Sequence, residues 1–191
     1  MLQHIIPSKA RRKILALFFH NIHESHYLRK IVRDVDEEVN AVKRELDILS
    51  EAKVLLKERR LNKILYTVNK NYQFYDEFLR LFAKSNSLAT DIIKNLPKIG
   101  KVKYVALSMK YVKKVEIKDD EIYILFVGTV VVPEVAQIIS AAEKIFGRDV
   151  NYTVMSEDEL AFRKKNNDPF IWRFLKHPKI MLVGHEEELL K

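Results

Sequence analysis

The sequence predicts an α+β protein built from two small domains. In the first half of the chain, three stretches with apolar residues at helical spacing precede two short strand-like stretches. The second half alternates strand-like and helical stretches, which is typical of a small mixed-sheet domain. The polar segment Ser85-Asn86-Ser87 separates the two patterns. We therefore expect one domain over residues 1–85 and a second over residues 86–191.

Composition restricts the class of protein. Apolar residues form 48% of the chain and charged residues 31%, enough of each for a packed core and a hydrated surface. No apolar run approaches the ~20 residues of a membrane span, and no signal peptide opens the chain. The absence of cysteine excludes disulfides and thiolate metal sites. We expect a cytoplasmic protein with no membrane partner.

The net charge of +8 is unevenly distributed. Residues 1–85 contain 17 Lys and Arg against 11 Asp and Glu, whereas residues 86–191 contain 17 against 15. This excess of positive charge on one module favours an anionic partner, either a nucleic acid or a membrane surface.

Two helices are expected at the start of the chain. Ser8 precedes an apolar series at helical spacing, which predicts an N-cap and a first helix with residues 11–13 on its polar face. Residues 21–25 end this helix. A second helix is expected from His26 to about Arg33, followed by a turn at residues 34–36 with a capping carboxylate.

The third helix, residues 37–51, has the clearest pattern. Spacings of three, four and three predict one buried face, formed by Val39, Val42, Leu46 and Leu49. The solvent-facing side is expected to carry Asn40, Lys43, Arg44 and Asp47. Glu37 and Glu38 complement the helix dipole at the N-terminus, but they would repel phosphate if they faced it.

A β-hairpin and an aromatic helix follow. Residues 54–60 and 64–68 read as two strands joined at residues 61–63, with a basic tip. Residues 72–82 have aromatic side chains at helical spacing, which predicts a helix whose stripe is either core or a dimer contact.

This order of elements resembles the winged helix-turn-helix regulators of bacteria and archaea, over residues 8–70. The matching strings are Tyr27-Leu28-Arg29-Lys30-Ile31-Val32, Val42-Lys43-Arg44-Glu45-Leu46 and Ala52-Lys53-Val54-Leu55. Lys53 stands where these proteins usually have a glycine in a left-handed turn, which costs stability but not the fold. The resemblance implies a DNA-binding transcriptional regulator that occupies a promoter.

The resemblance also implies which residues meet DNA. A major groove about 12 Å wide admits the third helix. Arg can form two hydrogen bonds with guanine and Asn with adenine, whereas Lys and the arginines of the hairpin hold phosphate. The expected DNA-binding residues are Asn40, Lys43, Arg44, Lys57, Arg59, Arg60 and Lys63. The alternative interpretation is a hydrated helix face without a nucleic-acid partner.

The second half predicts a small sheet with helices. A helix is expected at residues 89–96, and another at residues 133–146 that ends at Gly147. The expected strands are residues 102–109, 121–127, 150–154 and 180–183.

This half resembles the nucleotidyltransferase superfamily over residues 101–190. The matching strings are Val127-Gly128, residues 142–153, Asp168-Pro169-Phe170 and residues 179–184. Active members place Gly-Ser after one strand and Asp-x-Asp on the next, because carboxylates hold the metal ions that bridge a nucleotide's phosphates. Here the corresponding positions are Met109, Lys110, Glu121 and Tyr123, and the third acidic position is Asn151. The resemblance therefore implies a retained fold without catalysis, cofactor or metal.

Several alternatives remain open. The C-terminal domain is expected to serve oligomerisation, sensing of an unknown effector, or partner binding. The rivals are a divergent nucleotidyltransferase that modifies protein or RNA, and a protein-interaction module. Palindromic DNA sites match a homodimer, which residues 72–82 or 89–96 would build. His20, His23 and His26 are interpreted as surface histidines rather than a metal site.

Overall fold

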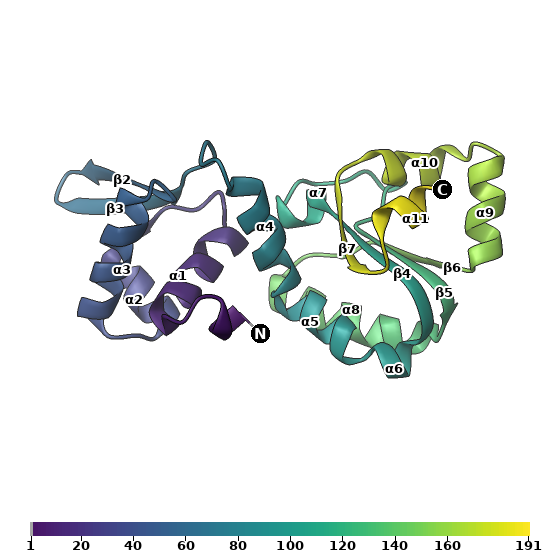
Figure 1. Cartoon of the computed structure of the whole chain (residues 1–191), viewed down its shortest axis with the longest axis horizontal. Coiled ribbons are helices and arrows are strands. Elements are labelled where there is room, and N and C mark those ends of the chain that lie inside the picture. The colour runs from purple at the N-terminus through teal and green to yellow at the C-terminus, as the bar shows by residue number, and fades with distance from the viewer. Residues whose placement is uncertain (1) are drawn as a thin grey trace. The chain divides into compact units, whose positions relative to one another are not determined.

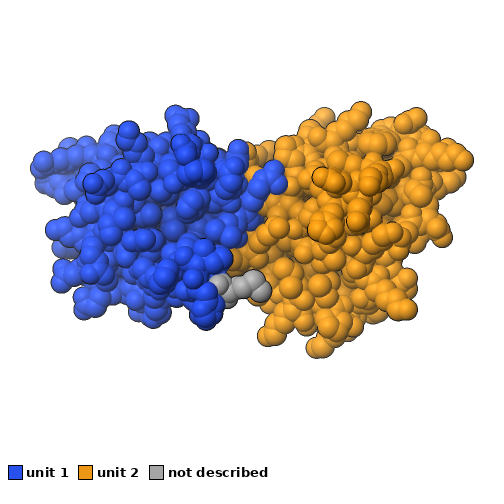
Figure 2. Space-filling view, viewed as in Figure 1, with its two compact units in different colours: residues 1–83 blue, residues 84–191 orange. Residues whose placement is uncertain are grey.

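The computed structural model describes residues 2–191, and its fold class is α+β, with 52% helix, 21% strand and two sheets (Figure 1). The chain divides into two compact units, residues 1–83 and residues 84–191 (Figure 2). The division falls next to the polar segment at Ser85. No helix within the described part of the chain is long and apolar enough to span a bilayer.

Unit 1 consists of helices around a small three-stranded antiparallel sheet with strand order β1-β3-β2. Its elements are η1 (Leu2–His4), α1 (Lys9–His20), β1 (His26–Tyr27), α2 (Leu28–Val35), α3 (Val39–Glu51), β2 (Leu55–Arg60), β3 (Lys63–Val68) and α4 (Tyr75–Lys84). Helices α1, α2 and α3 contact one another, and α3 contacts β2.

Helix α1 begins as the sequence predicts. The Ser8 hydroxyl accepts a hydrogen bond from the backbone N–H of Arg11 at 3.2 Å, which satisfies a free donor of the first turn. Ile14, Leu15 and Phe18 of this helix are buried in the core.

The prediction of a second helix starting at His26 was wrong. His26 and Tyr27 form strand β1, which pairs with Tyr66 and Leu65 of β3, and α2 begins only at Leu28. The His26 ring is fully buried and meets the Phe18 ring edge-on, which holds this segment against the core. The turn after α2 is left-handed at Asp36, with φ 49°, and no side chain caps α3.

The buried face of α3 differs from the predicted one at two positions. It begins at Val39, which is 45% exposed because the first turn lies beyond the core. Glu45 is buried instead, with 3% exposure. Its carboxylate accepts hydrogen bonds from Ser8 Oγ and Arg11 Nε, both at 2.7 Å, so a charge-assisted network ties α3 to the start of α1.

The hairpin has a shorter connection than the three residues expected. Arg60 pairs with Lys63, which leaves a two-residue turn at Leu61 and Asn62. Lys53 adopts the left-handed conformation, with φ 57°, at the position where the resemblance implied a glycine.

The aromatic side chains of α4 belong to the core of unit 1. The Phe19 ring lies 6.1 Å from Tyr75, 5.5 Å from Phe78 and 5.6 Å from Phe82, measured between ring centroids. Phe74 lies outside this cluster and is 46% exposed. Of the two interpretations of the stripe, the structure therefore shows the core.

Unit 2 is a four-stranded mixed sheet with strand order β6-β5-β4-β7, in which β4 is antiparallel to β5 and β7, and β5 is parallel to β6. Its elements are α5 (Ser87–Lys94), α6 (Leu96–Ile99), β4 (Gly100–Ser108), α7 (Met109–Val112), β5 (Ile124–Val130), α8 (Val132–Phe146), β6 (Tyr152–Met155), α9 (Glu157–Lys165), α10 (Pro169–Lys176), β7 (Lys179–Val183) and α11 (Glu186–Leu190).

Helices cover both faces of this sheet. One face packs against apolar side chains of α9, α10 and α11, including Leu160, Ile171 and Leu189. Helices α5 and α8 pack against each other on the other side (Figure 1). Leu88, Ala89 and Ile92 of α5 are buried, and α5 contacts α6, α8 and β7 of the same unit.

Several predicted boundaries in unit 2 shift, including that of β4, which spans Gly100–Ser108 rather than residues 102–109. Strand β5 begins at Ile124, so Glu121 and Tyr123 precede it. The expected helix at residues 89–96 is two helices, because Pro97 opens a new first turn in α6. Strand β6 begins at Tyr152 rather than at residue 150. Helix α8 ends at Gly147 as predicted, and this glycine adopts a left-handed conformation.

Candidate nucleic-acid interface

The N-terminal half of α3 presents polar and basic side chains to solvent. Burial of Val42, Leu46 and Leu49 turns Asn40, Lys43 and Arg44 outward, and all three are exposed. Within residues 2–191, neither Lys43 nor Arg44 forms an ion pair. These cations therefore remain available to an external anion. Asp47 and Glu51, further along the same helix, are also exposed, and Glu51 would repel phosphate, whereas the charge of Asp47 is partly offset by Lys57.

The acidic residues before α3 differ from each other in their surroundings. Glu37 accepts ion pairs from Lys13 at 2.7 Å and Lys9 at 2.9 Å, which turns its carboxylate toward α1. Hydrogen bonds from Lys13 and then Lys9 lower the pKa of Glu37. Its charge is thus compensated within the protein, whereas Glu38 is exposed at the N-cap of α3.

The alternation of side chains in β2 separates the basic residues of the hairpin. Leu55, Lys57 and Arg59 share one face, and Leu55 is buried in the core. Lys57 Nζ lies 3.8 Å from Asp47 Oδ1, so this face adjoins α3. No ion pair to Arg59 is formed anywhere in the described chain.

Arg60 and Lys63 lie on the opposite face of the hairpin. Arg60 donates from Nε and Nη2 to the Glu58 carboxylate at 3.0 and 3.2 Å, and these bonds raise the pKa of its guanidinium. Lys63 Nζ lies 5.1 Å from the centre of the Tyr27 ring. The structure therefore brings together five of the seven predicted residues. We call them the α3–wing surface: Asn40, Lys43, Arg44, Lys57 and Arg59.

A buried histidine, His26, lies in β1 and pairs with Tyr66 of the β2–β3 hairpin. His26 Nδ1 is 3.0 Å from Lys30 Nζ, and its Nε2 has no hydrogen-bond partner among residues 2–191. Burial, and then the charge of Lys30, lower the pKa of His26. The prediction that His26 is a surface histidine was wrong, because its ring is fully buried. Within the same residues, no group of three or more His, Cys, Asp or Glu side chains could hold a metal ion.

The five positions taken from the nucleotidyltransferase resemblance gather at one end of the unit 2 sheet. The backbone N–H of Ser108, next to Met109, donates to Tyr123 O at 2.7 Å, and the Tyr123 N–H donates to Asn151 O at 2.8 Å. Lys110 Nζ contacts both carboxylate oxygens of Glu121 at 2.9 Å.

This end of the sheet is filled by its own side chains. The cavity beside Lys110 and Glu121 has a volume of about 10 Å³, roughly that of one water probe. The hydrogen bonds from Lys110 lower the pKa of Glu121 and keep this carboxylate ionised. The Tyr123 hydroxyl donates to Val115 O at 3.0 Å.

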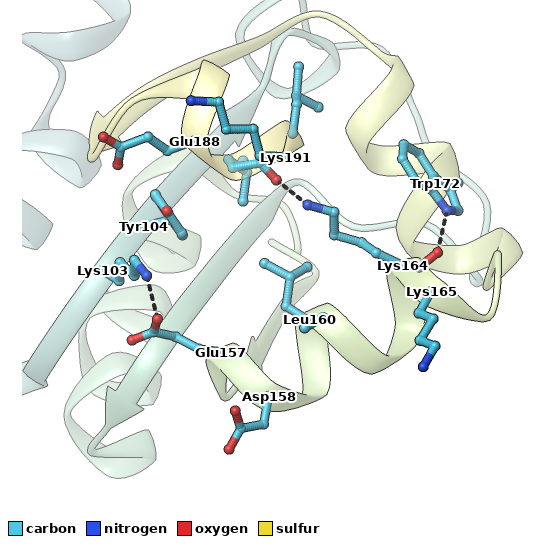
Figure 3. A pocket seen from close by; sticks show the side chains of 13 residues that line it. Lys103, Tyr104, Glu157, Asp158, Leu160, Lys164, Lys165, Trp172, Glu188 and Lys191 are labelled. Carbon is cyan, nitrogen blue, oxygen red and sulfur yellow. Dashed lines mark hydrogen bonds and ion pairs between the residues drawn. The ribbon is translucent and has the colours of Figure 1, made fainter.

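A larger open groove of about 560 Å³ lies among β4, α9 and α11 (Figure 3). Three interactions join groups that line it: Lys103 with Glu157, Lys164 Nζ with Leu189 O at 2.9 Å, and Trp172 Nε1 with Lys164 O at 3.3 Å. Trp172 is half-buried, as an anchor against the core. Sequence reasoning missed this groove because its walls come from separate elements.

No protein-family model, curated protein or solved structure matches this chain.

Proposed function

We propose that the protein is a DNA-binding transcriptional regulator. Unit 1 would be a winged helix-turn-helix, with α3 as the recognition helix and the β2–β3 hairpin as the wing. The observation that carries this proposal is the α3–wing surface, where Lys43, Arg44 and Arg59 are exposed on adjoining elements and form no ion pair within residues 2–191. A nucleic-acid backbone supplies the regular negative charge that such a surface fits.

The charges along α3 suggest how it meets the duplex. Asn40 and Arg44 are four residues apart and lie on one ridge of the helix. Asp47 and Glu51 follow on the C-terminal half. The helix therefore enters the major groove with its N-terminal half, so that Asn40 and Arg44 reach base edges while Lys43, Lys57 and Arg59 hold phosphate.

The network around Glu45 supports this geometry. Its carboxylate joins Ser8 and Arg11 of the α1 start to the inner side of α3. A buried charge with satisfied hydrogen bonds disfavours rotation of α3 about its axis, because rotation would leave the carboxylate unpaired. The exposed ridge is thus held in one orientation before DNA binds.

For unit 2 we propose a catalytically inactive nucleotidyltransferase-like domain that serves oligomerisation, sensing or partner binding. The Lys110 ammonium contacts Glu121 directly, and the positions of Tyr123 and Asn151 offer no carboxylate. The cavity of about 10 Å³ beside this pair leaves no room for a nucleotide.

Titration of a short fluorescent duplex at low salt tests the DNA-binding proposal. We expect the double variant Lys43→Ala, Arg44→Ala to bind at least tenfold more weakly, with a salt slope lower by about 0.9 for each lost phosphate contact. Lys98→Ala, Lys144→Ala is the matched control, since it removes the same charge from exposed positions of unit 2. Equal loss of affinity in both variants, or no binding by the wild type, would contradict the proposal.

A further inference from the structure

The tip of the β2–β3 hairpin carries an exposed leucine in an unfavourable backbone conformation. Leu61 is the first residue of the two-residue turn and is 95% exposed. Its φ of 52° lies in the left-handed region, where glycine and asparagine are the favoured residues. Leucine is unfavourable at this position, because its apolar side chain is exposed and its backbone is left-handed. The Leu61 side chain also contributes nothing to the core.

The surroundings of Leu61 are cationic. Arg59 and Arg60 precede it, and Lys63 follows it after one residue. The other exposed apolar side chains of the hairpin, Leu56 and Ile64, are 51% and 46% exposed and lie nearer the core. Leu61 is therefore an exposed apolar side chain at the tip of a positively charged hairpin.

We propose that Leu61 is a wedge that inserts between base pairs in the minor groove of bound DNA and bends the duplex. The inference rests on the proposed DNA-binding function and deepens it. Apolar side chains inserted into the minor groove partly unstack a base step and kink the duplex by about 20–90°. The negative potential of that groove attracts the neighbouring cations Arg59 and Lys63, which favours DNA over an apolar protein partner, whereas Arg60 is already paired with Glu58.

The conformation of the turn suits this role. A left-handed residue at the tip of a two-residue turn keeps its side chain at the far end of the hairpin. A strained backbone that the fold does not require is a reason to look for a functional contact. Because Leu61 has almost no contacts of its own, its substitution by glycine leaves the packing of unit 1 intact and relieves the backbone strain.

Ring closure of a short DNA fragment measures bending without knowledge of a binding site. The probe is a linear duplex of about 120 base pairs with cohesive ends, shorter than the persistence length of about 150 base pairs. DNA ligase closes such a fragment poorly unless a bound protein bends it. Binding of each variant is measured separately by mobility shift on the same fragment.

We expect the wild-type protein to raise the yield of circles by about tenfold, as kinks replace smooth bending. Leu61→Gly is expected to bind within about threefold of the wild type, because phosphate contacts dominate, but to leave the yield at the level of free DNA. Leu61→Met should restore bending, and Leu56→Ala should behave as the wild type.

Circle formation with Leu61→Gly at the wild-type level would overturn the wedge, as would wild-type binding without any increase in circles. Absence of a mobility shift with the wild type is a different result, since it would overturn the proposed DNA-binding function itself.

Discussion

The division of the hairpin into two faces makes a prediction that separates adjacent arginines. Arg59 lies on the face that adjoins α3 and has no ion-pair partner in residues 2–191, whereas Arg60 lies on the other face and bonds Glu58 at 3.0 Å. From the sequence alone, both were expected to hold phosphate. The structure instead predicts that Arg59→Ala weakens DNA binding and that Arg60→Ala has little effect.

The magnitude follows from counterion release. One lost phosphate contact lowers the slope of log K against log salt by about 0.9. Between about 50 mM and about 200 mM salt, a fourfold change in concentration, the affinity deficit of Arg59→Ala should therefore shrink by about 3.5-fold. For Arg60→Ala the deficit should stay near zero at both concentrations. The loss of Arg60 also frees the exposed Glu58 carboxylate, which adds only weak repulsion.

Fluorescence anisotropy on one labelled duplex at four or more salt concentrations measures both slopes. Circular dichroism controls for folding, which neither exposed position should change. Equal slopes for the two variants, or a larger effect of Arg60→Ala, would refute the assignment of the hairpin faces.

Four further outcomes are expected. Arg44→Ala should weaken the free energy of DNA binding by about 1–3 kcal/mol on a preferred site and by less on a scrambled duplex, as measured by competition. Glu45→Ala should lower the free energy of unfolding by about 1–2 kcal/mol in urea titrations, because Ser8 and the partly exposed Arg11 lose their hydrogen bonds to the buried carboxylate. Burial lowers the pKa of His26 below its ordinary value of 6.5, so as the pH falls the imidazole takes up a proton more readily in the unfolded chain than in the folded one. The free energy of unfolding should therefore fall from about pH 7 to about pH 5. His26→Phe should flatten that dependence. With magnesium or manganese, labelled nucleoside triphosphates should transfer no nucleotide; transfer that disappears in Glu121→Ala would favour the enzyme alternative.

The sequence predicted the fold class and most elements because their patterns are local. The stripe of Val42, Leu46 and Leu49 identified α3, and Gly147 identified the end of α8. Strand β1 was missed because two residues are too few to show a period. Glu45 was missed because a buried charge breaks the apolar pattern, and its partners lie 34 and 37 residues away.

The candidate site was predicted in its residue types and only in part in its geometry. Alternation along β2 was a signal in the sequence that would have separated Arg59 from Arg60. No local signal indicates that Lys110 pairs with Glu121, because the contact depends on how the loop after α7 returns to the sheet. Helix α9 was not predicted either, since Leu160 is its one buried residue in the described chain and no apolar stripe forms.

Selection of duplexes from a random library is the most direct test of the central claim, that the α3–wing surface reads DNA. The wild-type protein should enrich a motif, and Asn40→Ala, Arg44→Ala should lose the enrichment of specific bases while it still retains duplexes at low salt. Recovery of the unenriched library by the folded wild-type protein, or the same motif from both proteins, would contradict it.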